Sequence, residues 1–234
     1  MTQNDDAWYA DLIAAEQACE ATQLSEIKAR LADDPYTATA YAVSCGLADE
    51  VPPVLFDLWS EGQITDEQLP NALSAVWVRN RSPLRSLGER KWLTLFKAVG
   101  FFIVNSSGGR VIHIDGRATP IPTAFAHRDA QLVAPVEVWR GCPTSTNGRG
   151  MSWTIHRECA EGFAEGVATL GVEAGIYRAT IPPRAVLALF GDDREQEVVV
   201  NPNTLRGRIQ LHEIIPGRPL LRWPHATGPT GNTS

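Results

Sequence analysis

The sequence changes its periodicity at residues 101–114, which read FFIVNSSGGRVIHI. Two short runs of β-branched and aromatic residues flank a Gly-Gly pair, a pattern typical of a β-hairpin. We therefore predict that the chain is helical before Gly100 and consists mostly of strands after it. A cluster of helices followed by many short strands indicates an α+β fold with a mainly antiparallel sheet.

The residues before Gly100 carry helical signals. Apolar side chains recur every three or four positions from Leu12 to Leu31, and the run ends at Asp33-Asp34-Pro35. A second helix is predicted at 36–47. A break at Val51-Pro52-Pro53 separates it from a third helix, which begins at Val54. A fourth begins at a capping box at Thr65–Gln68 and runs through Trp77, and a fifth runs from Ser82-Pro83 to Gly100. Their aromatic stripes have the pattern of a buried core.

The residues after the hairpin alternate short apolar runs with turns. Strands are predicted at 131–140, 151–154, 175–181, 185–190, 195–200 and 209–215, with one helix at about 157–168. The polar tail at 226–234 has nothing to bury and is predicted to be disordered.

The two parts of the chain differ in net charge. Residues 1–80 carry 14 acidic and three basic side chains, a net charge of −11, whereas the remainder carries 13 acidic and 18 basic side chains, a net charge of +5. We therefore predict an acidic helical region at 1–80, a second domain at 81–225, and the tail. The acidic region is not expected to bind nucleic acid, and the second domain can bind an anion.

Composition indicates a soluble cytoplasmic protein. Hydrophobic residues make up 44% of the 234 residues, which is enough for a substantial core, and no run of 18 apolar residues suggests a membrane span. The first twenty residues lack the basic start of a secretory signal. The four cysteines have no paired C-x-x-C spacing, so we expect reduced thiols and no metal site. The phosphate-loop and G-x-G-x-x-G fingerprints are absent from the sequence.

Glu195-Gln196-Glu197 precedes three consecutive valines. If this run is one strand, Glu195 and Glu197 lie on the same face. Two close carboxylates repel each other, so they are either solvated charges at a strand entrance or groups with a function.

Three segments, taken together, resemble a known family. They are Val138-Trp139-Arg140-Gly141, Gly150-Met151-Ser152-Trp153-Thr154 and Glu195-Gln196-Glu197. In this order they resemble the mono-ADP-ribosyltransferases of the arginine-serine-glutamate type, and the resemblance covers roughly residues 140–202. The helix bearing Ala160, Phe163 and Ala164, and the segments at 175–179 and 186–188, are similar to that family's supporting elements. The middle motif is Ser-Trp-Thr where the family commonly has Ser-Thr-Ser, so Trp153 has either a site role or a place in the core.

The resemblance implies a split, mainly antiparallel β-sandwich that follows a helical region, with NAD as co-substrate. It implies that Glu197 stabilises the oxocarbenium-like ribose and that Ser152 orients this glutamate. Arg140 and Gly141 are expected to hold the NAD phosphates or ribose and the nicotinamide amide, with Ser152, Trp153, Thr154 and Glu197 completing the NAD site. Glu195 is expected to face the acceptor, an arginine side chain of a target protein.

Two alternatives remain at this stage. The same cleft can serve an NAD glycohydrolase with water as acceptor. The chain can also be a noncatalytic interaction protein that retains the fold and uses its helical region for binding. The sequence identifies neither the target protein nor a partner of the helical region.

Overall fold

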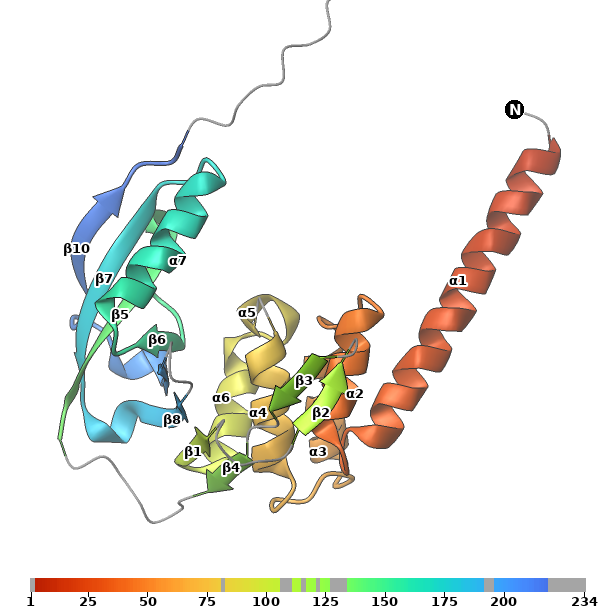
Figure 1. Cartoon of the computed structure of the whole chain (residues 1–234), viewed down its shortest axis with the longest axis horizontal. Coiled ribbons are helices and arrows are strands. Elements are labelled where there is room, and N and C mark those ends of the chain that lie inside the picture. The colour runs from red at the N-terminus through yellow and green to blue at the C-terminus, as the bar shows by residue number, and fades with distance from the viewer. Residues whose placement is uncertain are drawn as a thin grey trace, which may run out of the picture.

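The computed structural model describes residues 3–80, 83–105, 111–114, 117–120, 123–126, 134–191 and 196–218. Within these ranges, a helical N-terminal region precedes a mixed, mostly antiparallel sheet, so the predicted α+β class is confirmed (Figure 1). The helices are α1 (Gln3–Arg30), α2 (Pro35–Ser44), α3 (Val51–Ser60), α4 (Leu69–Arg79), α5 (Pro83–Ser86), α6 (Glu89–Val99) and α7 (Arg157–Thr169).

Local sequence signals predicted some of the helix boundaries and missed others. The two hydrogen bonds of the predicted capping box are present, because the Gln68 backbone N–H donates to Thr65 Oγ1 at 3.3 Å and the Thr65 N–H donates to Gln68 Oε1 at 3.0 Å. The helix α4 itself begins after the box, at Leu69. The predicted break at Val51-Pro52-Pro53 is wrong: these residues form the first turn of α3, where proline lacks only an N–H that has no partner in a helix. The single helix predicted from Ser82 is also wrong, because Gly88, with φ +81°, separates α5 from α6.

The strands are β1 (Phe102–Asn105), β2 (Val111–Ile114), β3 (Arg117–Pro120), β4 (Thr123–Ala126), β5 (Val136–Pro143), β6 (Ser152–Thr154), β7 (Ala174–Ile181), β8 (Val186–Gly191), β9 (Glu197–Val200) and β10 (Gln210–Ile215). The main sheet has the order β10-β7-β5-β6-β9-β8-β1-β4, and β2 pairs with β3 in a sheet of their own. All of these pairings are antiparallel except that of β1 with β8.

The hairpin predicted between residues 101–104 and 111–114 is wrong. β1 pairs instead with β4 and β8, and β2 pairs with β3. Phe102 and Val104 are buried, and Phe102 stacks on Phe96 of α6 with ring centroids 5.8 Å apart. A strand buried in this way needs partners on both edges, which a local hairpin alone does not provide.

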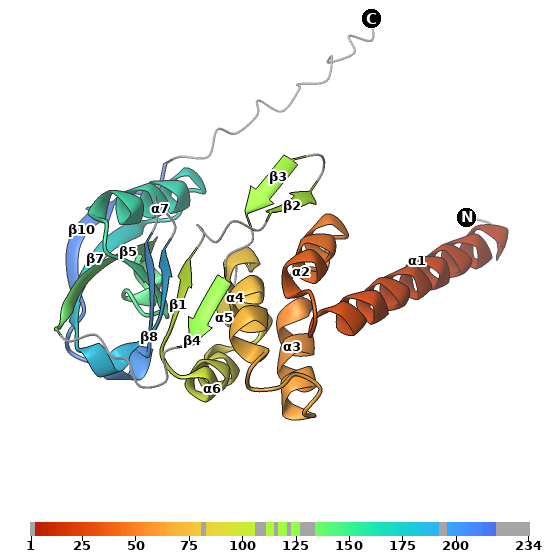
Figure 2. The same ribbon diagram turned by 60° about the horizontal axis from the view of Figure 1, so that its bottom comes forward.

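One hydrophobic core joins the helical region to the sheet. It contains Trp92 and Phe96 of α6 together with Phe102 of β1, Ala188 of β8 and Val199 of β9. A second helix layer is formed by α7, which packs on β5 and β7 (Figure 2). The domain boundaries at residues 80 and 225 stay predictions, and the tail at 226–234 lies outside the described residues.

The first turns of α1 extend away from the rest of the molecule in both views (Figures 1 and 2). Ile27 and Leu31 anchor its C-terminal end in the core, whereas Trp8, Leu12 and Ile13 are exposed. The apolar stripe predicted from Leu12 is therefore buried only at its end. In the described part of the chain, no helix has the length and apolar character needed to cross a membrane.

Candidate active site

A cavity of about 370 Å³ is lined by residues of both β5 and β6. These two strands share a single register pair, Trp139 with Thr154. The walls come from α4, β5, β6, α7 and β9 and comprise Trp77, Val78, Asn80, Trp139, Arg140, Gly141, Ser152, Trp153, Thr154, Ala160, Phe163 and Glu197. The cavity therefore brings together Arg140, Ser152 and Glu197, the three described residues to which the sequence assigned catalytic roles.

Arg140 spans the gap between the two strands. Its Nη1 donates a hydrogen bond to the Ser152 carbonyl, and its Nε is buried with no hydrogen-bond partner within the described residues. Gly150 leaves the room that the guanidinium occupies, because a Cβ at Gly150 would lie 2.5 Å from Arg140 Cζ. An unpaired buried donor is costly, so an acceptor that reached this nitrogen would be bound favourably.

Gly141 lies directly under α7. A Cβ at Gly141 would lie 1.9 Å from the Ala160 carbonyl oxygen and 2.6 Å from the Ala164 backbone nitrogen. Ala160 and Ala164 are fully buried against β5. In the structure, position 141 requires a glycine because α7 packs directly on it. The family resemblance instead assigned Gly141 to a close approach of the nicotinamide.

In the pairing of β6 with β9, the side chains of Ser152-Trp153-Thr154 alternate between the two faces of the sheet. Ser152 is opposite Val199 and Thr154 is opposite Glu197, so Ser152, Thr154 and Glu197 share a face of the sheet. Trp153 points the other way. It is 2% exposed, packs in the core and donates from Nε1 to the Gly150 carbonyl at 3.0 Å. The geometry favours a core role for its ring, although Trp153 contributes to the cavity lining.

The carboxylate of Glu197 accepts a hydrogen bond from the helical region. Trp77 Nε1 of α4 donates to Glu197 Oε1 at 3.0 Å, across 120 residues of sequence. No hydrogen bond joins the Ser152 hydroxyl to Glu197 among the described residues, so the orienting role assigned to Ser152 stays a prediction. The helical pattern placed Trp77 only in the core; the side chain is indeed 3% exposed, yet it also lines the cavity.

The strand that carries Glu197 begins later than predicted. β9 begins at Glu197, two residues later than expected, and Gln196 has φ +32°, which is outside the extended region. The alternation that placed both glutamates on one face therefore does not extend back through Gln196. Glu195 itself lies outside the described residues, so its predicted role stays a prediction.

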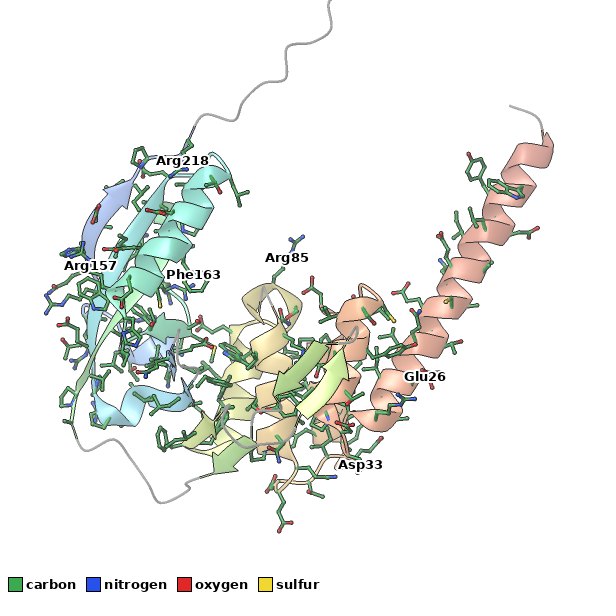
Figure 3. All side chains as sticks on the ribbon, viewed as in Figure 1. Glu26, Asp33, Arg85, Arg157, Phe163 and Arg218 are labelled. Atoms are coloured by element: carbon green, nitrogen blue, oxygen red, sulfur yellow. The ribbon has the colours of Figure 1, made fainter. Side chains whose placement is uncertain are left out.

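The charges and rings of the cavity suit a particular kind of ligand. Of its lining residues, Arg140 and Glu197 are the charged ones. Trp139 and Phe163 supply aromatic walls, and Phe163, 56% exposed, comes from α7 (Figure 3). This arrangement can take a ligand with a flat ring, an anionic group near Arg140 and a developing positive charge near Glu197.

Groups of three or more His, Cys, Asp or Glu side chains that could hold a metal ion were not found among the described residues. The chain matches no protein-family model, no curated protein and no solved structure.

Proposed function

We propose that this chain is an NAD-dependent mono-ADP-ribosyltransferase that transfers ADP-ribose from NAD to a protein side chain, arginine by resemblance, and releases nicotinamide. The observation that carries the proposal is the meeting of Arg140, Ser152 and Glu197, from three different strands, in the lining of one cavity. Each of these residues belongs to a different one of the three segments that together resemble the family.

The chemistry gives Glu197 and Arg140 a task each. Cleavage of the bond between nicotinamide and ribose develops positive charge on the sugar, and Glu197 stabilises that charge. The buried Arg140 Nε, which has no partner among the described residues, offers a donor for a phosphate or ribose oxygen of NAD. A cavity of about 370 Å³ with aromatic walls accommodates the nicotinamide and ribose end of the dinucleotide.

We also propose that this α+β fold is the split β-sandwich of the family. The junction between β5 and β6 consists of one register pair, whereas β5 pairs with β7 along eight residues from Val136 to Pro143. A sheet held so weakly at one junction is suited to open there around a ligand. The proposed NAD site lies at this junction.

One assay tests the function and both alternatives. The full chain is incubated with NAD labelled in the adenylate part and with a mixture of proteins. Label on protein supports transfer, free ADP-ribose alone indicates the NAD glycohydrolase, and neither product indicates a noncatalytic interaction protein.

The carboxylate requirement is tested with a matched pair of variants. We expect Glu197→Gln to lower transfer and hydrolysis by about 100-fold or more, because it keeps the size of the side chain and removes the charge that faces the ribose. Glu158→Gln, an exposed carboxylate on α7, is the control and is expected to retain activity. Near wild-type turnover in Glu197→Gln would refute the assignment.

The acceptor is tested at Glu195. A guanidinium is almost always protonated and needs a carboxylate that binds it and takes its proton as it attacks. We therefore expect Glu195→Gln to keep NAD hydrolysis and lose transfer to arginine. Equal loss of both activities would contradict the division of roles between the two glutamates, and loss of neither would make Glu195 a solvated charge.

A further inference from the structure

We propose that Trp77 is a positioning residue for Glu197: its indole N–H fixes the carboxylate in the cavity and holds it ionised. This inference rests on the proposed function and deepens it, because it assigns a part of the site to the helical region. The contact is the hydrogen bond of 3.0 Å from Trp77 Nε1 to Glu197 Oε1.

The indole of Trp77 is held by its neighbours. It meets the ring of Trp92 and the ring of Phe96 edge to face, each with centroids 5.0 Å apart and an interplanar angle of 88°. The side chain is 3% exposed. A buried ring wedged between two others has little freedom to rotate, so its single N–H keeps one direction. That direction is toward the Glu197 carboxylate.

A fixed donor on one carboxylate oxygen has two consequences. It orients the carboxylate, and it favours the charged form because an indole N–H only donates. Arg140, the other charged residue among the lining residues of the cavity, also favours the charged form, but it does so in the wild type and in the Trp77 variant alike. Removal of the donor should raise the pH at which Glu197 becomes protonated. A hydrogen bond to a charged group corresponds to a shift of about one pH unit or more.

The activity test uses two tryptophan variants of the full chain. Trp77→Phe keeps an aromatic ring in the cluster and removes the N–H. Trp92→Phe makes the same change in the ring that packs against Trp77, in a residue that does not line the cavity. We expect Trp77→Phe to lower kcat about tenfold with KM for NAD within about threefold of wild type, and to move the acid limb of the kcat–pH profile up by about one unit.

Trp92→Phe is expected to lower the unfolding temperature while keeping the acid limb in place. An unchanged acid limb in Trp77→Phe would overturn the proposal. The same shift of the limb in both variants would also overturn it, because a general loosening of the core would then explain the effect.

A second readout does not depend on activity. In the full chain labelled with ¹⁵N-tryptophan, the Trp77 indole N–H resonance is followed as a function of pH in the wild type and in Glu197→Gln. A titration in the wild type that disappears in Glu197→Gln supports the contact, and identical pH dependence in both proteins overturns it. If the wild type does not cleave NAD, the proposed function fails, and this titration still decides whether Trp77 positions Glu197.

Discussion

The substitution Gly141→Ala separates two explanations for a glycine beside Arg140. In one explanation the glycine admits the nicotinamide, and in the other it admits α7. The added Cβ would lie 1.9 Å from the Ala160 carbonyl oxygen and 2.6 Å from the Ala164 nitrogen, both of them helix backbone atoms. A backbone atom cannot rotate away as a side chain can, so the helix itself has to move.

The size of the effect follows from these distances. Relief of the contact with the Ala160 oxygen requires α7 to move by about 1.5 Å, since non-bonded atoms attract best at about 3.5 Å. The move would separate Ala160, Ala164 and Ala168, all fully buried, from the sheet. Overpacking typically costs 1–3 kcal/mol, and a clash with backbone belongs at the upper end, so we expect a loss of about 3 kcal/mol. For a chain of this length that corresponds to a fall in Tm of about 6–12 °C.

The assay is urea or thermal unfolding, with Gly162→Ala as the control. Gly162 lies on α7 as well, but a Cβ there has no atom within 4 Å. Alanine at this helical position should stabilise the protein by up to about 1 kcal/mol. A Gly141→Ala protein with wild-type stability and weakened NAD binding would refute the packing explanation and restore the nicotinamide approach.

Three further outcomes are expected. Arg140→Lys should raise Kd for NAD about tenfold in a calorimetric titration, because a point charge does not replace a planar fork of donors; unchanged affinity would count against the cavity as the NAD site. Ser152→Ala should lower kcat more than it raises KM, and the reverse in steady-state kinetics would assign Ser152 to binding. Burial raises the pKa of Tyr36, whose hydroxyl is hydrogen-bonded to Ser74, so above about pH 10 the unfolded chain ionises first and stability falls. Unfolding at about pH 8 and 10.5 should therefore show a smaller alkaline loss in Tyr36→Phe than in the wild type.

The elements that the sequence predicted are those whose signals are local. The capping box at Thr65 and Gln68 forms its two hydrogen bonds within four residues, and the stripe from Trp92 to Phe96 repeats along one helix face. Pro52 and Pro53 led to the wrong prediction of a break, because proline is compatible with the first turn of a helix as well as with a break between helices. Only the surrounding structure distinguishes these two cases.

The sequence did not predict which strands pair, because pairing depends on strands that are far apart in the chain. Residues 101–104 and 111–114 look like a hairpin locally, yet β1 pairs in parallel with β8, more than eighty residues later. Of the candidate site, Arg140, Ser152 and Glu197 were predicted from the order of their motifs. Trp77 was not predicted as a site residue, because a tryptophan on a helix face shows the same sequence pattern whether or not its indole N–H binds a carboxylate.

The helical region and the sheet share one hydrophobic core beside the cavity. Interfaces between independent domains are usually polar, whereas here a single apolar cluster extends from Ile27 through Trp77 and Phe96 to Val199 on the strand of Glu197. Because Trp77 belongs to this cluster and also donates to Glu197, a large cavity beside it, such as Phe96→Ala would make, would release the indole and so the carboxylate. Phe96→Ala should therefore lower activity as well as stability, whereas Trp92→Phe, which keeps a ring against Trp77, should lower stability alone. The acidic helical region, which carries none of the three motifs, would then influence catalysis through Trp77, whose packing positions the Glu197 carboxylate.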